Sequence, residues 1–206
     1  AIAQNAIAQK KVDFALEAKI NRPKALKGAD FIVNSIEVTP RFKWFDMDIE
    51  IPRKYGFKQV YGENGGPGGL FHSLRVIPPI LEICDDIHKI CPNAYIINFS
   101  NPMSRVCLAI KRKHPKLKVV GLCHEIHFAH MHLPKILGTP WENLDLWAGG
   151  LNHFGAVIKA SYKDSGKDAI PDIRTKAPEY LEKMKAQNKI NYVFNTSVSL
   201  TSYILY

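Results

Sequence analysis

The chain has 206 residues, and its 28 Lys and Arg against 19 Asp and Glu give a formal net charge of +9. Hydrophobic residues make up 46 % of the sequence, which excludes wholesale disorder and indicates a packed core. No apolar run reaches the ~20 residues of a membrane-spanning helix, and no helix-turn-helix, zinc-finger or RNA-binding signature accompanies the positive charge. We therefore expect neither a membrane nor a nucleic acid as a partner.

The first part of the chain alternates between two kinds of segment. Strand-like segments are short apolar runs bounded by turn residues, at 31–36, 94–100 and 118–123. Helical segments have apolar residues at helical spacing, at 6–20, in parts of 41–56, and at 70–90, 103–113 and 124–137. We expect Pro78 and Pro79 to break or kink the third of these helices, and Asn101 to cap the fourth. This alternation predicts βαβ units in a parallel, doubly wound sheet.

The pattern changes near residue 146. Longer strands are predicted at 147–155 and 157–162, followed by a charged helix over about 178–187. We therefore expect a Rossmann-like domain over 1–145 and the beginning of an α+β domain over 146–206. Four cysteines, at 84, 91, 107 and 123, are too widely spread for a disulfide framework and are typical of reduced thiols, which predicts a cytoplasmic protein.

Polar residues follow several of the predicted strands. The second strand leads into Asn101, the third into Cys123 and His124, and the later strand pair holds Asn152 and His153. In an open α/β sheet, ligands bind outside the carboxyl ends of the strands, so these positions are candidates for an active site. Taken singly, each has a structural alternative, because an Asn can cap a helix and a Cys or His can be an ordinary core residue.

Two further segments could carry chemistry. The segment 124–132 is rich in histidine, but it fails the zinc-protease pattern because Phe128 stands where the second His is required. The glycine-rich loop at 62–69 matches neither a dinucleotide nor a P-loop signature. Its Gly68 could nevertheless expose a backbone N–H to an anion or a cofactor at the start of the next helix, the alternative being a plain tight connection.

Five motifs in a fixed order resemble glycoside hydrolase family 4, the NAD- and manganese-dependent glycosidases, and look closest to its α-galactosidase and α-glucosidase-like branch. They are Ile51-Pro-Arg-Lys-Tyr-Gly56, Gly66-Pro-Gly-Gly69, Asn98-Phe-Ser-Asn-Pro-Met103, Gly121-Leu-Cys-His124 and Gly150-Leu-Asn-His153. The resemblance implies a fold akin to the lactate and malate dehydrogenases. It also implies a small glycoside as substrate and a homodimer or homotetramer as the assembly.

The resemblance assigns roles to particular residues. Cys123 and His153 would hold Mn²⁺ or another divalent metal, and His124 and Tyr203 would act in catalysis. The other assignments are sugar contacts for Asn101, Asn152 and Arg75, and NAD contacts for Asn34, Gly68 and Asn98. The implied reaction cleaves α-glycosides by NAD-dependent oxidation at C3, metal-assisted deprotonation at C2 and β-elimination of the aglycone.

One departure from the family keeps other functions open. Nothing before Ala25 supplies the strand and glycine-rich dinucleotide loop with which family members begin, and the chain starts without an initiator Met or signal peptide. We therefore expect the middle of a longer protein. The alternatives are a hydroxy-acid dehydrogenase-like oxidoreductase of the same fold and a non-catalytic basic binding fragment.

Overall fold

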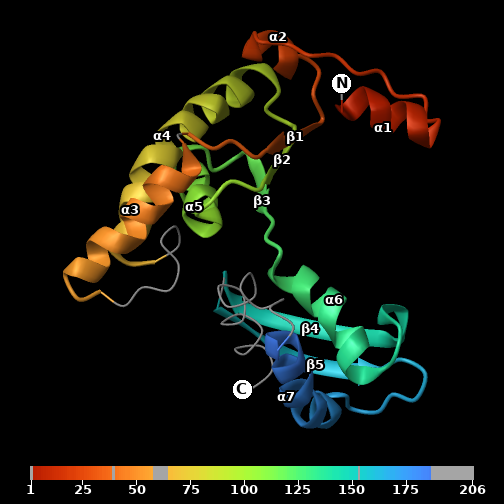
Figure 1. Ribbon diagram of the computed structural model, residues 1–206. Helices are drawn as coiled ribbons and strands as arrows, with labels where there is room; N and C mark the ends of the chain where they lie inside the picture. Colours follow the sequence, from red (N-terminus) through yellow and green to blue (C-terminus); the bar gives the residue numbers. More distant parts are fainter. Residues whose placement is uncertain (1, 39, 58–64, 153, 187–206) are drawn as a thin grey trace.

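A computed structural model describes residues 2–38, 40–57, 65–152 and 154–186 of the chain (Figure 1). Its main sheet has three parallel strands in the order β1-β2-β3. They are β1 (Phe31–Asn34), β2 (Tyr95–Asn98) and β3 (Lys118–Gly121). Each lies within a predicted apolar run, so the parallel sheet expected from the alternation of strands and helices is confirmed.

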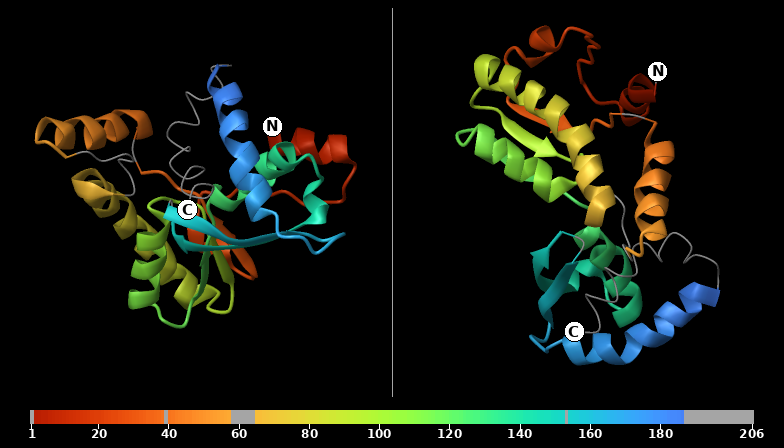
Figure 2. Two further views of the ribbon diagram at one scale, coloured as in Figure 1. Left: turned by 90° about the horizontal axis from the view of Figure 1, so that it is seen from below. Right: turned by 90° about the vertical axis from the view of Figure 1, so that its left-hand side faces the viewer.

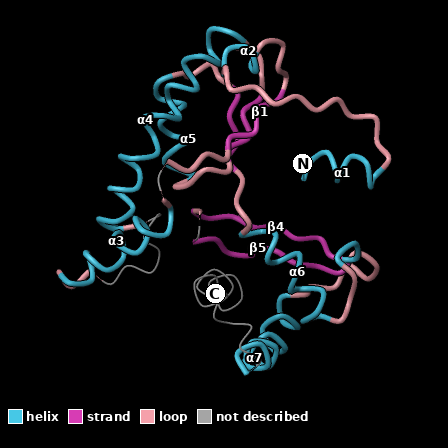
Figure 3. The backbone as a smooth tube through the Cα atoms, turned by 45° about the horizontal axis from the view of Figure 1, so that its top comes forward, coloured by secondary structure: helices cyan, strands magenta, loops and turns pink. Residues whose placement is uncertain are grey.

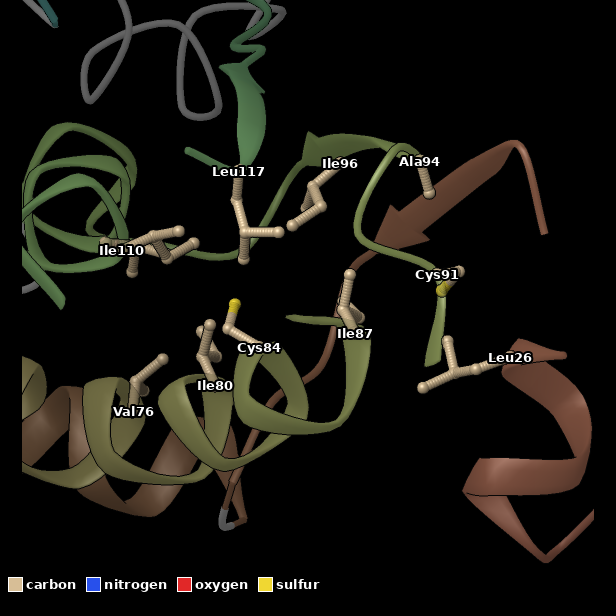
Figure 4. Packing of buried hydrophobic residues seen from close by; sticks show 11 residues of the cluster. Leu26, Val76, Ile80, Cys84, Ile87, Cys91, Ala94, Ile96, Ile110 and Leu117 are labelled. Carbon is tan, nitrogen blue, oxygen red and sulfur yellow. The ribbon is translucent and has the colours of Figure 1, made fainter. Parts of the chain in front are cut away.

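One face of this sheet is covered by two helices, α4 (Gly66–Ile90) and α5 (Met103–Lys113), which lie on the same side in Figure 1. Figure 4 shows α4 side chains directed toward Ile96 of β2, Ile110 of α5 and Leu117. These residues are almost completely buried. Apolar residues recur every three or four positions along α4, so one stripe of this long helix meets the sheet.

Of the break or kink expected at Pro78 and Pro79, the break is not observed, because α4 continues through both prolines to Ile90. Proline cannot donate a backbone hydrogen bond within a helix, and this loss normally destabilises the helix interior. Here, Val76 and Ile80 are each only 2 % exposed and flank the prolines on the buried face. Packing on both sides of the prolines therefore outweighs the local penalty.

The N-terminal region also differs from the expectation. The helix α1 (Ile2–Lys10) buries no residue, and it ends where Lys11 takes a positive φ of 51°. Residues 12–19 have no regular structure, so the predicted helix over 6–20 is wrong beyond Lys10. A short helix α2 (Arg22–Leu26) follows, capped by the Asn21 side chain, and its Leu26 joins the core beneath α4.

A second group of elements follows β3. It comprises α6 (Glu125–Leu137), a 3₁₀ turn (Trp141–Asn143), β4 (Leu144–Leu151), β5 (Phe154–Tyr162) and α7 (Ile170–Ala186). Figure 3 shows β4 and β5 running side by side as an antiparallel hairpin. The helix predicted over about 178–187 begins earlier, at Ile170, because Ala169, Ile173 and Ala177 pack against α6 and the hairpin.

The face of the main sheet opposite α4 and α5 is exposed. Phe31 and Val33 of β1 are 68 % and 63 % exposed, and Tyr95 and Val120 about half. The rings of Phe31 and Tyr95 stack with centroids 5.8 Å apart. Within the described ranges, β1 pairs only with β2, so its outer edge is free.

A further helix, α3 (Arg41–Lys54), lies beside the N-terminal half of α4 (Figure 2). It coincides with the predicted partly helical segment 41–56. Among the helices in the described part of the chain, none combines the length and the apolar character needed to cross a membrane.

Candidate active site

The three parallel strands end level with one another. In the register of the sheet, Asn34 of β1 lies beside Asn98 of β2, which lies beside Gly121 of β3. We call this side of the sheet the carboxyl edge. The sequence placed three candidate groups after strand ends, and the structure brings two of them, the segments 98–102 and 121–124, to this edge.

A buried hydrogen-bond network joins the first two strand ends. Asn34 Nδ2 donates to Asn98 Oδ1 at 2.7 Å, and Asn98 Nδ2 donates to the carbonyl oxygen of Ser100 at 2.9 Å. Ser100 Oγ in turn donates to the carbonyl oxygen of Ile36 at 2.8 Å. Asn98 has no exposed surface, while Asn34 and Ser100 are 6 % and 4 % exposed. The loops after β1 and β2 are therefore tied together by side chains.

Asn101 follows this network and is half-buried, with a cis peptide bond to Pro102. The helix α5 begins at Met103 with Pro102 in the capping position and no side-chain cap. The expectation that Asn101 caps this helix is therefore wrong.

The loop after β3 carries two of the predicted site residues. Leu122 N donates to the carbonyl oxygen of Asn98 at 2.9 Å, which holds the start of this loop against the end of β2. Cys123 is half-buried and forms no disulfide, and His124 is exposed at the position that precedes α6. A half-buried thiol and an exposed imidazole thus follow each other beside the Asn98 network.

The other three cysteines are packing residues. Burial raises the pKa of Cys84 to about 11 and also raises the pKa values of Cys91 and Cys107. A thiol with a raised pKa stays protonated and is a poor metal ligand. Cys84 and Cys91 both belong to the hydrophobic core beneath the parallel sheet.

The N-terminal part of α4 is bonded to α5. Gly68 and Gly69 are buried in its first turn, and Ser73 Oγ donates to the carbonyl oxygen of Gly69 at 2.6 Å. Arg105 Nη1 of α5 donates to Ser73 Oγ at 3.4 Å, which links the two helices near their starts. Gly69 N donates to the carbonyl oxygen of Gly65 at 3.0 Å, so this backbone N–H group is bonded within the first turn of the helix.

Arg75 is engaged elsewhere, at the contact between α3 and α4. Its Nη2 forms an ion pair with Asp48, whose side chain is 7 % exposed, and its guanidinium lies 5.3 Å from the centre of the Trp44 ring. No hydrogen-bond partner for Arg75 Nε or for the buried His72 Nε2 is found among the described residues. The sequence analysis did not identify Asp48 as a partner of Arg75. In the sequence, Asp48 is simply an acidic residue within the partly helical segment 41–56.

The histidines of α6 serve packing. The rings of His127 and His130 stack, and His130 meets the Trp141 ring edge-on at 4.7 Å. His132 is 7 % exposed, and its Nδ1 forms a 2.8 Å hydrogen bond with the hydroxyl of Tyr180 on α7. Burial and, to a smaller extent, Lys135 lower the pKa of His132.

The remaining predicted residues belong to the C-terminal part. Asn152 is half-buried and directly follows β4, at the turn of the hairpin. His153 and Tyr203 lie outside the described residues. Within those residues, no group of three or more His, Cys, Asp or Glu side chains is arranged to hold a metal.

Comparison with known proteins gives relatives of one family. The model for "Family 4 glycosyl hydrolase" matches residues 1–139. An alpha-glucosidase of Erwinia rhapontici is 53 % identical over 188 residues, which are 91 % of this chain and 42 % of that protein. An alpha-galactosidase of Bacillus subtilis (strain 168) is 33 % identical over 165 residues, 80 % of this chain and 38 % of that protein. The chain thus spans about two fifths of the length of these curated relatives.

Solved structures support the fold. A 6-phospho-alpha-glucosidase from gut microorganisms, in complex with NAD and Mn²⁺, matches with a TM-score of 0.75 and 25 % identity, over 85 % of this chain and 40 % of that one. A malate dehydrogenase from Plasmodium falciparum matches with a TM-score of 0.53 and 12 % identity, over 98 % of this chain and 54 % of that one. The predicted dehydrogenase-like α/β fold is therefore confirmed.

Proposed function

The chain belongs to the family 4 glycosyl hydrolases, and on that premise we propose that it carries part of the active site of an enzyme that cleaves α-glucosides. The observation that carries this proposal is the 53 % identity to an alpha-glucosidase over 91 % of the chain. The alpha-galactosidase named above is 33 % identical, so glucosides are preferred to galactosides as the proposed substrate.

We propose NAD as cofactor and Mn²⁺ as metal. The carboxyl edge suits a dinucleotide, because three parallel strands end level there and ligands of open α/β sheets bind outside the carboxyl ends of the strands. Gly68 is the proposed cofactor contact in the glycine-rich start of α4. The thiol of Cys123 is a group that can bind a divalent metal. His153 is the proposed second ligand. When bound, NAD supplies a hydride acceptor, and the metal supplies a Lewis acid toward sugar hydroxyl oxygens.

The proposed roles of the side chains follow from their places. Asn101 and Asn152 carry amides that can donate to sugar hydroxyls and accept from them. His124 is exposed directly after Cys123, so its imidazole can deliver a proton to the glycosidic oxygen of a sugar held at the carboxyl edge. Tyr203 is the proposed base. Arg75 is omitted from the sugar contacts, because Asp48 and Trp44 engage its guanidinium.

Hydrolysis of nitrophenyl sugars tests the proposal. The protein is assayed under reducing conditions against the α-glucoside, the α-galactoside, the β-glucoside and the α-glucoside 6-phosphate, with NAD⁺ and Mn²⁺. We expect the α-glucoside to be cleaved fastest, and the activity to disappear with a chelator and return with Mn²⁺. Activity that survives removal of both NAD⁺ and metal would contradict the proposal.

A further inference from the structure

We infer that Asn34, Asn98 and Ser100 are positioning residues, which hold the segment 99–102 in place without touching sugar or cofactor. The inference deepens the proposed function and rests on it, because the segment carries Asn101, the proposed sugar contact. It also replaces the cofactor contacts that the family resemblance implied for Asn34 and Asn98. Three observations support it: the direction of the amide groups, their burial, and the strand ends that they connect.

The amide groups point at each other and at the protein backbone. Asn98 Oδ1 accepts from Asn34 Nδ2 at 2.7 Å, while Asn98 Nδ2 donates to the carbonyl oxygen of Ser100 at 2.9 Å. Both ends of the Asn98 amide are thus used within the protein. Each end keeps one further N–H or lone pair, and the complete burial of Asn98 keeps both from a ligand at the carboxyl edge.

Burial supports the same conclusion. Asn98 has no exposed surface, and Asn34 and Ser100 are each more than nine-tenths buried. A ligand at the carboxyl edge cannot reach the Asn98 side chain unless the surrounding residues move. By contrast, Asn101 and Cys123, which follow the network, are half-buried and accessible in part.

The network also joins all three strand ends. The Asn98 side chain binds Asn34 of β1, and its carbonyl oxygen accepts from Leu122 N in the loop that leads to Cys123. Phe99 N donates to the carbonyl oxygen of Asn34 at 2.7 Å, and Ser100 Oγ donates to that of Ile36 at 2.8 Å. Asn98 therefore bonds to Asn34 through its side chain and to the loop after β3 through its carbonyl oxygen, so the loops after β1, β2 and β3 are tied to one residue.

A shift of a reacting group by about 1 Å can reduce the rate roughly 100-fold while leaving ground-state binding nearly unchanged. Loosening this network should therefore lower kcat much more than it changes substrate or cofactor affinity. Ser100→Ala is the mildest variant, because it removes only the hydroxyl that binds Ile36. Asn34→Ala removes the donor to Asn98.

The matched control is Asn93→Ala. Asn93 is exposed and precedes β2, so it lies at the opposite end of the strand that ends in Asn98. We expect Ser100→Ala and Asn34→Ala to lower kcat roughly 10–100-fold, with the KM for the nitrophenyl α-glucoside and the Kd for NAD⁺ within about 2-fold of wild type. Asn93→Ala should match wild type. The inference is overturned if Ser100→Ala keeps the wild-type kcat. It is also overturned if Asn34→Ala raises the Kd for NAD⁺ strongly while Ser100→Ala does not.

Hydrogen exchange followed by NMR measures the network without any enzymatic activity. The side-chain N–H groups of Asn34 and Asn98 should exchange at least roughly 10-fold more slowly than those of exposed Asn93, because they are buried and bonded. Fast exchange of these groups in a wild-type protein that cleaves the α-glucoside overturns the inference but leaves the proposed function intact. Slow exchange in a wild-type protein that cleaves no glycoside contradicts the proposed function but leaves the network intact.

Discussion

Gly121 is the residue at which α5 comes closest to the sheet. A Cβ atom at this position would lie against the side chain of Met103 and 2.8 Å from Cys107 Sγ. Both neighbours belong to α5, which packs on β3. The absence of a side chain at the end of β3 therefore sets the distance between helix and strand beside the candidate active site.

We expect Gly121→Ala to lower the free energy of unfolding by about 1–3 kcal/mol, because overpacking forces α5 or its side chains to shift. Urea unfolding measures the effect. Gly149→Ala is the control, since its added Cβ meets only the end of the Ile158 side chain, which is 70 % exposed and free to rotate. Equal losses of stability in the two variants would contradict this account.

Cys123 is the cysteine that the structure leaves accessible beside the carboxyl edge. We expect Cys123→Ser to weaken Mn²⁺ binding by more than the roughly 10–100-fold that removal of an outer-sphere partner costs, because a direct ligand is lost. Titration of free Mn²⁺ by electron paramagnetic resonance measures this without an activity assay. Cys91→Ser is the control, because Cys91 is buried at the far end of α4. Unchanged Mn²⁺ affinity in Cys123→Ser would refute the ligand assignment.

At the scale of elements, the ion pair between Asp48 and Arg75 joins α3 to α4. We expect Arg75→Met to lower the free energy of unfolding by about 3 kcal/mol, because the buried Asp48 carboxylate loses its charged partner. Arg53→Met is the matched control: its pair with Glu50 is exposed, so the change should stay within about 0.5 kcal/mol. The double variant of Asp48→Asn and Arg75→Met should recover part of the loss, and chemical denaturation of all four proteins checks these expectations.

The contact between α6 and α7 depends on His132. Burial lowers the pKa of His132 below its ordinary value of 6.5, so the unfolded chain takes up a proton at this residue more readily than the folded protein does. The stability contributed by neutral His132 is complete above pH 6.5 and is lost as the pH falls toward the lowered pKa. We expect unfolding free energy to decline over this window, and His132→Gln to flatten the decline.

Unfolding by urea at a series of pH values from 5 to 8 measures this dependence. His127→Gln is the control, because His127 is exposed on the same helix. If His127→Gln flattened the profile as much as His132→Gln does, the assignment to His132 would be wrong.

The sequence predicted those elements whose hydrophobic pattern is local. The three parallel strands and most helices follow from apolar runs and helical spacing. The continuation of α4 through Pro78 and Pro79 could not be predicted, because it depends on packing against a sheet whose strands lie elsewhere in the chain. The end of α1 at Lys10 was missed because nothing in the apolar pattern signals the positive φ that Lys11 adopts.

The candidate site was predictable to a similar degree. Position after a strand end was enough to select Asn101, Cys123 and His124. The partners of Asn98 and Arg75 were not predictable, since Asn34 is 64 residues from Asn98 and Asp48 is 27 residues from Arg75. The amide of an Asn and the guanidinium of an Arg can bind a ligand or form hydrogen bonds within the protein. Which of the two occurs depends on the residues that the fold brings next to them.

At the scale of the whole molecule, the described residues form two separate hydrophobic cores. One lies between α4, α5 and the parallel sheet, and the other between α6, α7 and the hairpin. The chain passes from the first to the second through residues 122–124, which include Cys123 and His124. The proposed metal ligand Cys123 and the proposed acid His124 therefore lie on the connection between the two cores.

The bare face of the main sheet is an apolar surface at which copies of this chain are expected to associate. Apolar side chains of β1 and β3 face solvent beside a free strand edge, a combination that promotes association between copies. The net charge of +9 opposes such contacts, and 1 M salt shortens the range of that repulsion from about 10 Å at 0.1 M to about 3 Å.

We therefore expect the mass measured by light scattering to rise with NaCl concentration. Val33→Lys should suppress the rise, because it places a charge on the bare face, whereas Ile158→Lys on the exposed hairpin should not. Association that is insensitive to Val33→Lys would exclude this face as its cause. Low ionic strength is accordingly the condition in which single copies of this chain can be studied.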